Sequence, residues 1–89
     1  MKVRKKPVVV EAWKLSGDDI EIIEVPPMWV MDAGQAGVLK RHFGGIWEIS
    51  TPEGSMFARD GDYIIKGVHS ELYPIQKKIF EETYEVLQE

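Results

Sequence analysis

The titratable side chains that could do chemistry lie close together in the last third of the sequence. Asp60 and Asp62 are two positions apart, as are His69 and Glu71, and on a strand this spacing puts both members of a pair on one face. An imidazole with one or two carboxylates could hold a divalent cation. No HExxH, DxDxDG or similar motif supports such a site. We therefore favour the simpler interpretation, in which the aspartates bond the backbone of their own turn and His69 lies at an exposed hairpin tip.

The hydroxyl side chains do not indicate a catalytic nucleophile. All of them lie in or next to expected turns or strand ends: Ser16, Ser50, Thr51, Ser55, Ser70 and Thr83. None lies in a nucleophile-elbow pattern such as G-x-S-x-G. The chain has no cysteine, which excludes thiolate nucleophiles, thiolate metal ligands and disulfides together. Gly44-Gly45 joins two strand-like runs, so we interpret it as a hairpin turn rather than a phosphate-binding loop. We expect no enzyme activity, no bound metal and no cofactor.

The cations leave one ligand-binding possibility open. A nucleotide-like signal molecule held between subunits would need positive charge at the seam, which these residues could supply: Arg41, Lys66, Lys77 and Lys78. Arg41 and Lys66, together with His69 and Glu71, are therefore weaker candidates for a ligand site. A metal-dependent hydrolase that uses His69 and Glu71 is a third, still weaker, alternative.

The charge balance argues against nucleic acid as a partner. The formal net charge is −4, so a phosphate backbone would repel the molecule as a whole. The basic N-terminal cluster of Lys2, Arg4, Lys5 and Lys6 is interpreted as a solvated arm. No apolar run approaches the roughly 18 residues of a membrane-spanning helix, and no signal peptide is recognisable. We therefore expect no membrane association and a cytoplasmic location.

Apolar side chains behind a double proline form the leading candidate for an interface. Met28, Trp29 and Met31 follow Pro26-Pro27, and three tryptophans in 89 residues are more than one small core easily hides. Exposed tryptophan favours a protein interface. The alternative, an ordinary core helix, stays open. A small fold without disulfides often gains stability by oligomerising, so we expect a protein partner and a homo-oligomer.

The local pattern predicts strands separated by short turns. The strand predictions are Pro7–Leu15, Val38–Phe43, Ile46–Thr51, Ser55–Arg59, Asp62–Val68, Glu71–Ile75 and a closing strand at Thr83–Leu87 beside the first. A helix is predicted at Pro27–Ala36 and a short helix or turn at Lys77–Glu82. Asp18–Val25 fits a helix or a strand equally. Tight turns are expected at Gly44-Gly45, at Pro52–Gly54 and at His69-Ser70.

These elements predict one α+β domain over residues 1–89. We expect a bent antiparallel sheet or small open barrel of about five or six strands, with one or two short helices laid against it. Hydrophobic residues at 44% and charged residues at 29% are ordinary globular values.

Four blocks of the sequence form a specific pattern: RKKPVVVEAWKLSGD, EISTPEG, GDYIIKGVHSELYP and IFEETYE. Together they resemble a family of small proteins encoded by tailed phages and prophages. The chain departs from the family pattern at Ser70, where glycine is usual, and at Ile75, where cysteine is frequent. Serine tolerates a positive-φ turn less well than glycine, and Ile75 removes any thiol chemistry.

The resemblance implies a phage origin and a shared fold, and it implies no catalytic residues. We expect a phage or prophage accessory protein in the cytoplasm of the bacterial host, acting as a non-enzymatic protein-binding module and a homo-oligomer. The alternative is a protein that binds or sequesters a small nucleotide-like signal.

Overall fold

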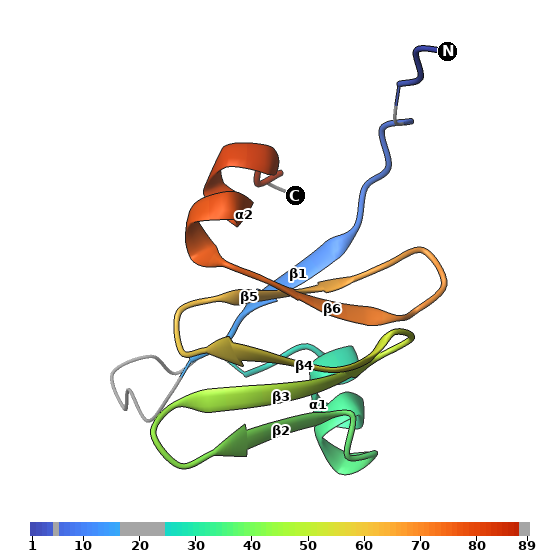
Figure 1. The fold of residues 1–89 in the computed structure, drawn as a ribbon. Coiled ribbons are helices and arrows are strands. Elements are labelled where there is room, and N and C mark those ends of the chain that lie inside the picture. Colours follow the sequence, from blue (N-terminus) through green and yellow to red (C-terminus); the bar gives the residue numbers. More distant parts are fainter. Residues whose placement is uncertain (5, 17–24, 88–89) are drawn as a thin grey trace.

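The computed structural model describes residues 1–4, 6–16 and 25–87, and within them the chain forms two helices and six strands (Figure 1). In chain order these are β1 (Glu11–Lys14), α1 (Met28–Gln35), β2 (Leu39–His42), β3 (Ile46–Thr51), β4 (Gly54–Arg59), β5 (Tyr63–Lys66), β6 (Leu72–Ile75) and α2 (Lys77–Thr83). The predicted α+β class is confirmed.

The strands form two three-stranded antiparallel sheets, not a closed barrel. Sheet A has the order β1-β5-β6 and sheet B the order β2-β3-β4. Sheet B is a meander, in which each strand pairs with its neighbour in sequence. Sheet A instead brings the N-terminal β1 back to β5, with Trp13 opposite Ile64. β6 contacts β3 and β4, which places the two sheets against each other. The strands therefore form open antiparallel sheets, as predicted, and do not close into a barrel.

The core lies between the sheets and is closed by α1. Ile49 from β3, Ile64 from β5 and Leu15 after β1 are fully buried, and α1 adds Val30 and Ala33 to the same cluster. α2 lies on the other face of sheet A, where its buried Phe80 stacks on Tyr63 with ring centroids 3.9 Å apart. Each helix thus covers a different part of the strands (Figure 1).

The first hairpin of sheet B turns where the two glycines predict it. Gly44 and Gly45 have φ angles of 83° and 75°, a region that glycine enters without steric cost. His42 pairs with Ile46, so the loop also includes Phe43. The predicted two-residue turn is therefore wrong by one residue. Phe43 is fully exposed at the tip.

The β5–β6 loop is longer than the predicted tight turn at His69-Ser70. The predicted strands Asp62–Val68 and Glu71–Ile75 are shortened, because β5 ends at Lys66 and β6 begins at Leu72. The Ser70 N–H donates to the Gly67 carbonyl at 3.0 Å. Ser70 has φ 64°, which is the left-handed conformation that glycine would adopt more easily. The turn geometry expected from the resemblance is thus kept in spite of the serine.

The predicted closing strand Thr83–Leu87 is wrong. Thr83 ends α2, and residues 84–87 form no strand. The Tyr84 N–H donates to the Phe80 carbonyl at 2.9 Å, and the two rings stack at 5.3 Å. Tyr84 therefore continues the aromatic stack on α2 instead of returning to the sheet.

The first predicted strand, Pro7–Leu15, is too long. β1 begins only at Glu11, because Glu11 lies opposite Lys66, the last residue of β5. Residues before it have no neighbouring strand to pair with among those described. The helix-or-strand alternative for Asp18–Val25 falls mainly on residues 17–24, which lie outside the described residues.

Candidate functional site

α1 exposes two of the three side chains proposed as an interface. The Val30 and Met31 N–H groups both donate to the Pro27 carbonyl, at 3.0 and 3.2 Å. Pro27 is therefore the N-cap of α1, with ψ 156°, and the predicted helix Pro27–Ala36 is one residue too long at each end. Val30 faces the core, whereas Met28 is 68% and Met31 43% exposed. Trp29 is half-buried and packs against the core. We call Met28, Trp29 and Met31 the α1 surface.

A shallow groove runs beside the α1 surface, between α1 and the β5–β6 hairpin. Its volume is about 320 Å³, and it is lined by Trp29, Asp32, Ala33, Ala36, Val38, Lys66, Ser70 and Leu72. Most of these side chains are apolar, and one acid and one base, Asp32 and Lys66, stand among them. We call this hollow the α1 groove. It brings together Trp29 and Lys66, two residues that the sequence proposed for different sites.

A second hollow adjoins the first. It has a volume of about 240 Å³ and is lined by Val9, Val10, Glu11, Lys66, Gly67, Val68 and Ser70. Lys66 and Ser70 line both hollows. The Lys66 side chain therefore lies where the two meet.

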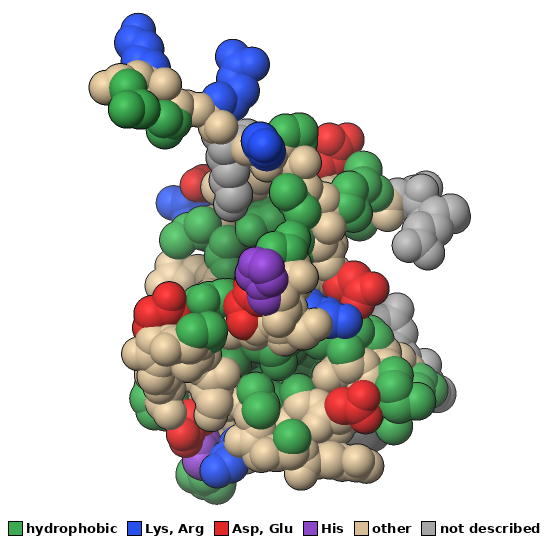
Figure 2. Space-filling view, turned by 90° about the vertical axis from the view of Figure 1, so that its right-hand side faces the viewer, with side chains coloured by type: hydrophobic (Ala, Val, Ile, Leu, Met, Phe, Trp, Pro, Cys, Tyr) green, Lys and Arg blue, Asp and Glu red, His purple; other side chains and the backbone are tan. Residues whose placement is uncertain are grey.

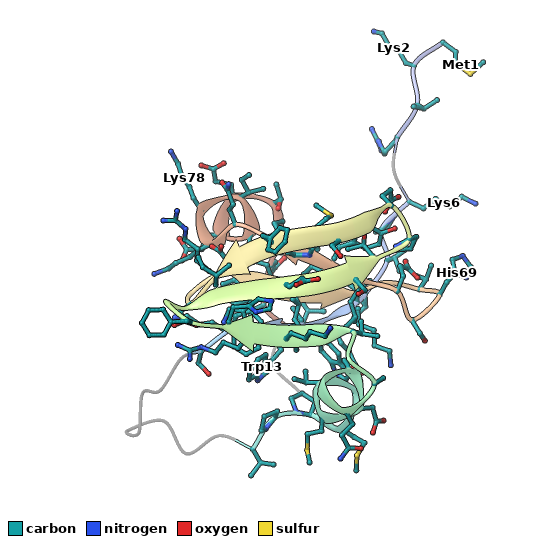
Figure 3. The ribbon with its side chains drawn as sticks, turned by 60° about the horizontal axis from the view of Figure 1, so that its bottom comes forward. Met1, Lys2, Lys6, Trp13, His69 and Lys78 are labelled. Atoms are coloured by element: carbon teal, nitrogen blue, oxygen red, sulfur yellow. The ribbon has the colours of Figure 1, made fainter. Side chains whose placement is uncertain are left out.

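His69 and Glu71 do not come together as a metal site. The Glu71 carboxylate accepts the backbone N–H of His69 at 2.9 Å. A Cβ at Gly67 would overlap the same carboxylate, so glycine makes room for it. The His69 side chain points away from the body at the loop tip (Figure 3). Among the described residues no three or more His, Asp or Glu side chains are grouped to hold a metal ion.

Arg41 lies in sheet B, bound to an acid that the sequence assigned to a turn. Its Nε and Nη2 donate to the two carboxylate oxygens of Asp60, at 3.2 and 2.8 Å. The Trp47 indole N–H donates to Asp60 Oδ1 at 2.7 Å. The hydrogen bond from Arg41, aided by that from Trp47, lowers the pKa of Asp60 although partial burial opposes the shift. Arg41 thus serves a structural ion pair and does not line the α1 groove.

Asp62 stabilises two backbone segments. Its Oδ2 accepts the Arg59 N–H and its Oδ1 the Lys77 N–H, both at 3.0 Å. The first bond is the turn bond predicted for this residue. The second caps the N-terminus of α2, whose own preceding residue, Gln76, provides no side-chain cap. The local sequence around Lys77 holds no signal for this long-range cap.

Two further side chains have shifted pKa values, Glu48 on β3 and Tyr73 on β6. The hydrogen bond from His42 lowers the pKa of Glu48, whose Oε1 lies 2.8 Å from the imidazole Nε2. Desolvation raises the pKa of Tyr73, and the hydrogen bond that its hydroxyl donates to Glu53 at 3.4 Å adds to the shift. Neither group lines the α1 groove.

Lys77 and Lys78 lie away from the other proposed cations. Lys78 is on α2, at the opposite end of sheet A from His69 (Figure 3). The cations proposed for a nucleotide-like ligand therefore do not gather within the described part of one copy, and of these cations Lys66 alone lines the two hollows described above. The groove residues Asp32, Ala36, Val38 and Leu72 were not predicted, because no local pattern links a helix to a distant hairpin.

No protein-family model, curated protein or solved structure matches the chain. No helix in the described part of the chain is long and apolar enough to cross a membrane.

Proposed function

We propose that the protein is a phage or prophage accessory protein that works without catalysis, by binding another protein through the α1 surface and the α1 groove. The observation that carries the proposal is that Met28 and Met31 are exposed beside an apolar hollow. The resemblance to phage proteins supports the phage origin and with it a place of action in the cytoplasm of the bacterial host.

The chemistry of this surface suits a protein partner. Methionine side chains are flexible and polarisable, and they adapt to apolar partners of different shape. Trp29 presents a large ring at the groove, and aromatic anchors contribute strongly to binding. Asp32 and Lys66 can orient a partner by charge. We expect the partner to insert an apolar side chain into the groove and to carry charges that complement this acid and base.

Capture from a lysate of the bacterial host tests the proposal. Met28→Glu places a charge in the α1 surface and should abolish capture of the partner. Phe57→Glu is the matched control, since Phe57 is also an exposed apolar side chain, 64% exposed on β4 of sheet B. Equal capture by both variants would contradict a binding role for the α1 surface.

A small-molecule ligand is the second candidate, because Lys66 lines both adjoining hollows. A nucleotide-like signal would place its phosphate near this ammonium group. A panel of nucleotides and cyclic nucleotides should then raise the melting temperature of the wild type and not that of Lys66→Ala. If no compound in the panel raises the melting temperature of the wild type, this alternative is contradicted.

A further inference from the structure

β1 is an edge strand, and its outer edge has no partner among the described strands. It pairs antiparallel with β5 on one side, from Glu11 opposite Lys66 to Lys14 opposite Tyr63, and it ends the strand order β1-β5-β6. An unpaired edge carries a row of free N–H and C=O groups, which can pair with another chain. The outer edge of β1 can therefore accept one further strand.

The residues before β1 extend this edge beyond the body. We call residues 1–4 and 6–10 the N-terminal arm. Val9 and Val10 still line the second hollow, and the arm then extends away from the body with basic side chains towards its end (Figures 1 and 2). β5 does not follow it, because Gly67 turns into the β5–β6 loop. Val8 is 55% and Val9 79% exposed, although valine favours strands. The arm thus has strand-forming side chains without a strand partner.

Continued through the arm, the strand alternation of β1 directs the hydrogen-bonding groups of alternate residues outward. The Leu15 N–H donates to the Asp62 carbonyl at 2.8 Å, so Leu15 points its backbone groups towards the β5 side. Successive strand residues point these groups to opposite edges. Residues 12 and 14 of β1 therefore point theirs outward, and residues 8 and 10 do the same when the arm continues the strand. Pro7 lacks an N–H, but in this alternation the missing donor lies on the inner side. The outer edge from Val8 to Lys14 keeps every donor.

We propose that this edge pairs antiparallel with the same edge of a second copy across a two-fold axis at Val9, which joins two sheets of order β1-β5-β6 into one continuous sheet. In this register Val9 faces Val9 of the second copy, and Val8 faces Val10. The exposed valines are then buried against one another. Because both copies use the same surface, the assembly closes as a dimer.

Like charges disfavour the two registers displaced towards Lys14, and an axis at Val8 would leave only Val8 facing a valine. An axis at Val10 would put Lys6 opposite Lys14, and an axis at Glu11 would put that carboxylate opposite itself, both of which are unfavourable. An axis at Ala12 avoids like charges but leaves no valine facing a valine. In the register at Val9, Lys6 lies opposite Ala12, so the pairing ends before Arg4 meets Lys14.

This inference goes beyond the proposed function: it concerns the homo-oligomer expected from the sequence, and it uses a surface distinct from the α1 surface. Variants in the arm leave Met28 and Met31 in place. If the wild type is monomeric but still captures a partner, only the strand pairing fails. If it is a dimer but captures no partner, only the protein-binding role fails.

A cysteine scan tests the register, and the natural chain contains no cysteine to interfere. Facing residues of a non-hydrogen-bonded antiparallel pair have Cα atoms about 4.5 Å apart, within the range that a disulfide spans. Val9→Cys should therefore form a disulfide-linked dimer under mild oxidation. Val3→Cys is the control, since Val3 is 84% exposed on the same arm but outside the paired segment. Cross-linking of both variants at the same rate would overturn the register.

A pair of proline variants tests the hydrogen bonds. Val10→Pro removes an outward N–H from each copy and should weaken the dimer by at least about tenfold. Val9→Pro removes an inward N–H that has no acceptor in the pairing, so this variant should stay dimeric. Light scattering across the micromolar range measures the mass, which should be twice 10.2 kDa for the wild type. A monomeric wild type, or equal dissociation of both variants, would overturn the proposal.

Discussion

Asp60 is the side chain that connects most of sheet B. Its carboxylate binds Arg41 on β2 and Trp47 on β3, while its own N–H donates to the Gly45 carbonyl at 3.0 Å. A Cβ at Gly45 would come within 2.6 Å of this carboxylate. Trp47 in turn meets Trp13 of β1 edge-on, with ring centroids 6.3 Å apart. One acid thus links the first hairpin to the core.

We expect Asp60→Asn to lower the free energy of unfolding by about 1 kcal/mol. The amide cannot form the same paired bonds with Arg41, although partial exposure to solvent limits the loss. Urea unfolding measures the change. Asp32→Asn is the control, because Asp32 is an exposed acid on α1, and it should change stability by less than about 0.5 kcal/mol. An Asp60→Asn variant as stable as wild type would contradict a stabilising role for this pair.

The stabilisation by Asp60 should depend on pH with a definite sign. Its pKa is lowered in the folded state, so the contribution is present above the ordinary aspartate pKa and is lost as pH falls through the lower, folded value. The stability difference between wild type and Asp60→Asn should therefore be largest near neutrality and shrink below about pH 4. Urea unfolding at several pH values gives the difference, and a gap that widens in acid would contradict the assignment.

Local sequence predicts part of what these acids do. The turn bond of Asp62 to the Arg59 N–H is confirmed, because an aspartate three residues away from an N–H is a local arrangement. Asp60 binds residues 19 and 13 positions earlier. No spacing pattern indicates such partners, since they become neighbours only when the strands pair.

At the scale of the elements, the segment after Phe80 shows a tertiary contact overriding a local strand pattern. Thr83–Leu87 alternates as a strand would, yet Thr83 belongs to α2. The aromatic stack of Tyr63, Phe80 and Tyr84 holds this segment against β5. α2 also depends on Asp62, which caps it from outside its own sequence. A strand pattern was therefore overridden by packing.

Phe80→Ala should destabilise the protein by about 3–4 kcal/mol, because it removes the buried ring that packs between α2 and sheet A and leaves a cavity there. Ile79 is the matched control on the same helix, since it is 44% exposed and its change to Ala should cost less than about 1 kcal/mol. Thermal unfolding followed by circular dichroism measures both. Equal losses would mean that α2 does not depend on the Phe80 stack.

Ser70→Gly should stabilise the β5–β6 loop by about 0.5–1 kcal/mol, because glycine adopts the positive φ of Ser70 without steric cost. The larger entropy of glycine in the unfolded chain offsets part of the gain. The change in unfolding free energy in urea is the measurement. Gly61→Ser, at φ 98°, is the converse change and should destabilise. A destabilised Ser70→Gly would show that the serine side chain contributes more than its backbone strain costs.

At the scale of the molecule, the fold class and the positions of the turns could be predicted, whereas the lengths of two turns and the surfaces could not. Strand propensity, Gly44-Gly45 and Pro27 act over a few residues, and the elements they indicate are present. The α1 groove instead joins α1 to β6, segments that meet only through the packed core. For the same reason Arg41 and Lys66, proposed for one site, lie in different sheets.

If the chain dimerises through β1, its melting temperature should rise with protein concentration, because dilution favours dissociation and then unfolding. Val10→Pro should remove this dependence, and Val9→Pro should retain it. Thermal unfolding of the wild type and both variants over a hundredfold dilution series measures this dependence. A wild-type melting temperature that does not change with concentration would argue against a dimer whose dissociation is coupled to unfolding.

The contrast between the two sheets has a consequence for the order of folding. Sheet B closes through short hairpins, so its contacts form early and at low entropic cost. Sheet A is complete only when residue 11 reaches residue 66, a long closure that local turns do not assist. During synthesis β1 emerges first but must wait for β5 before it can pair. The strand with the open edge is therefore among the last to be fixed in place.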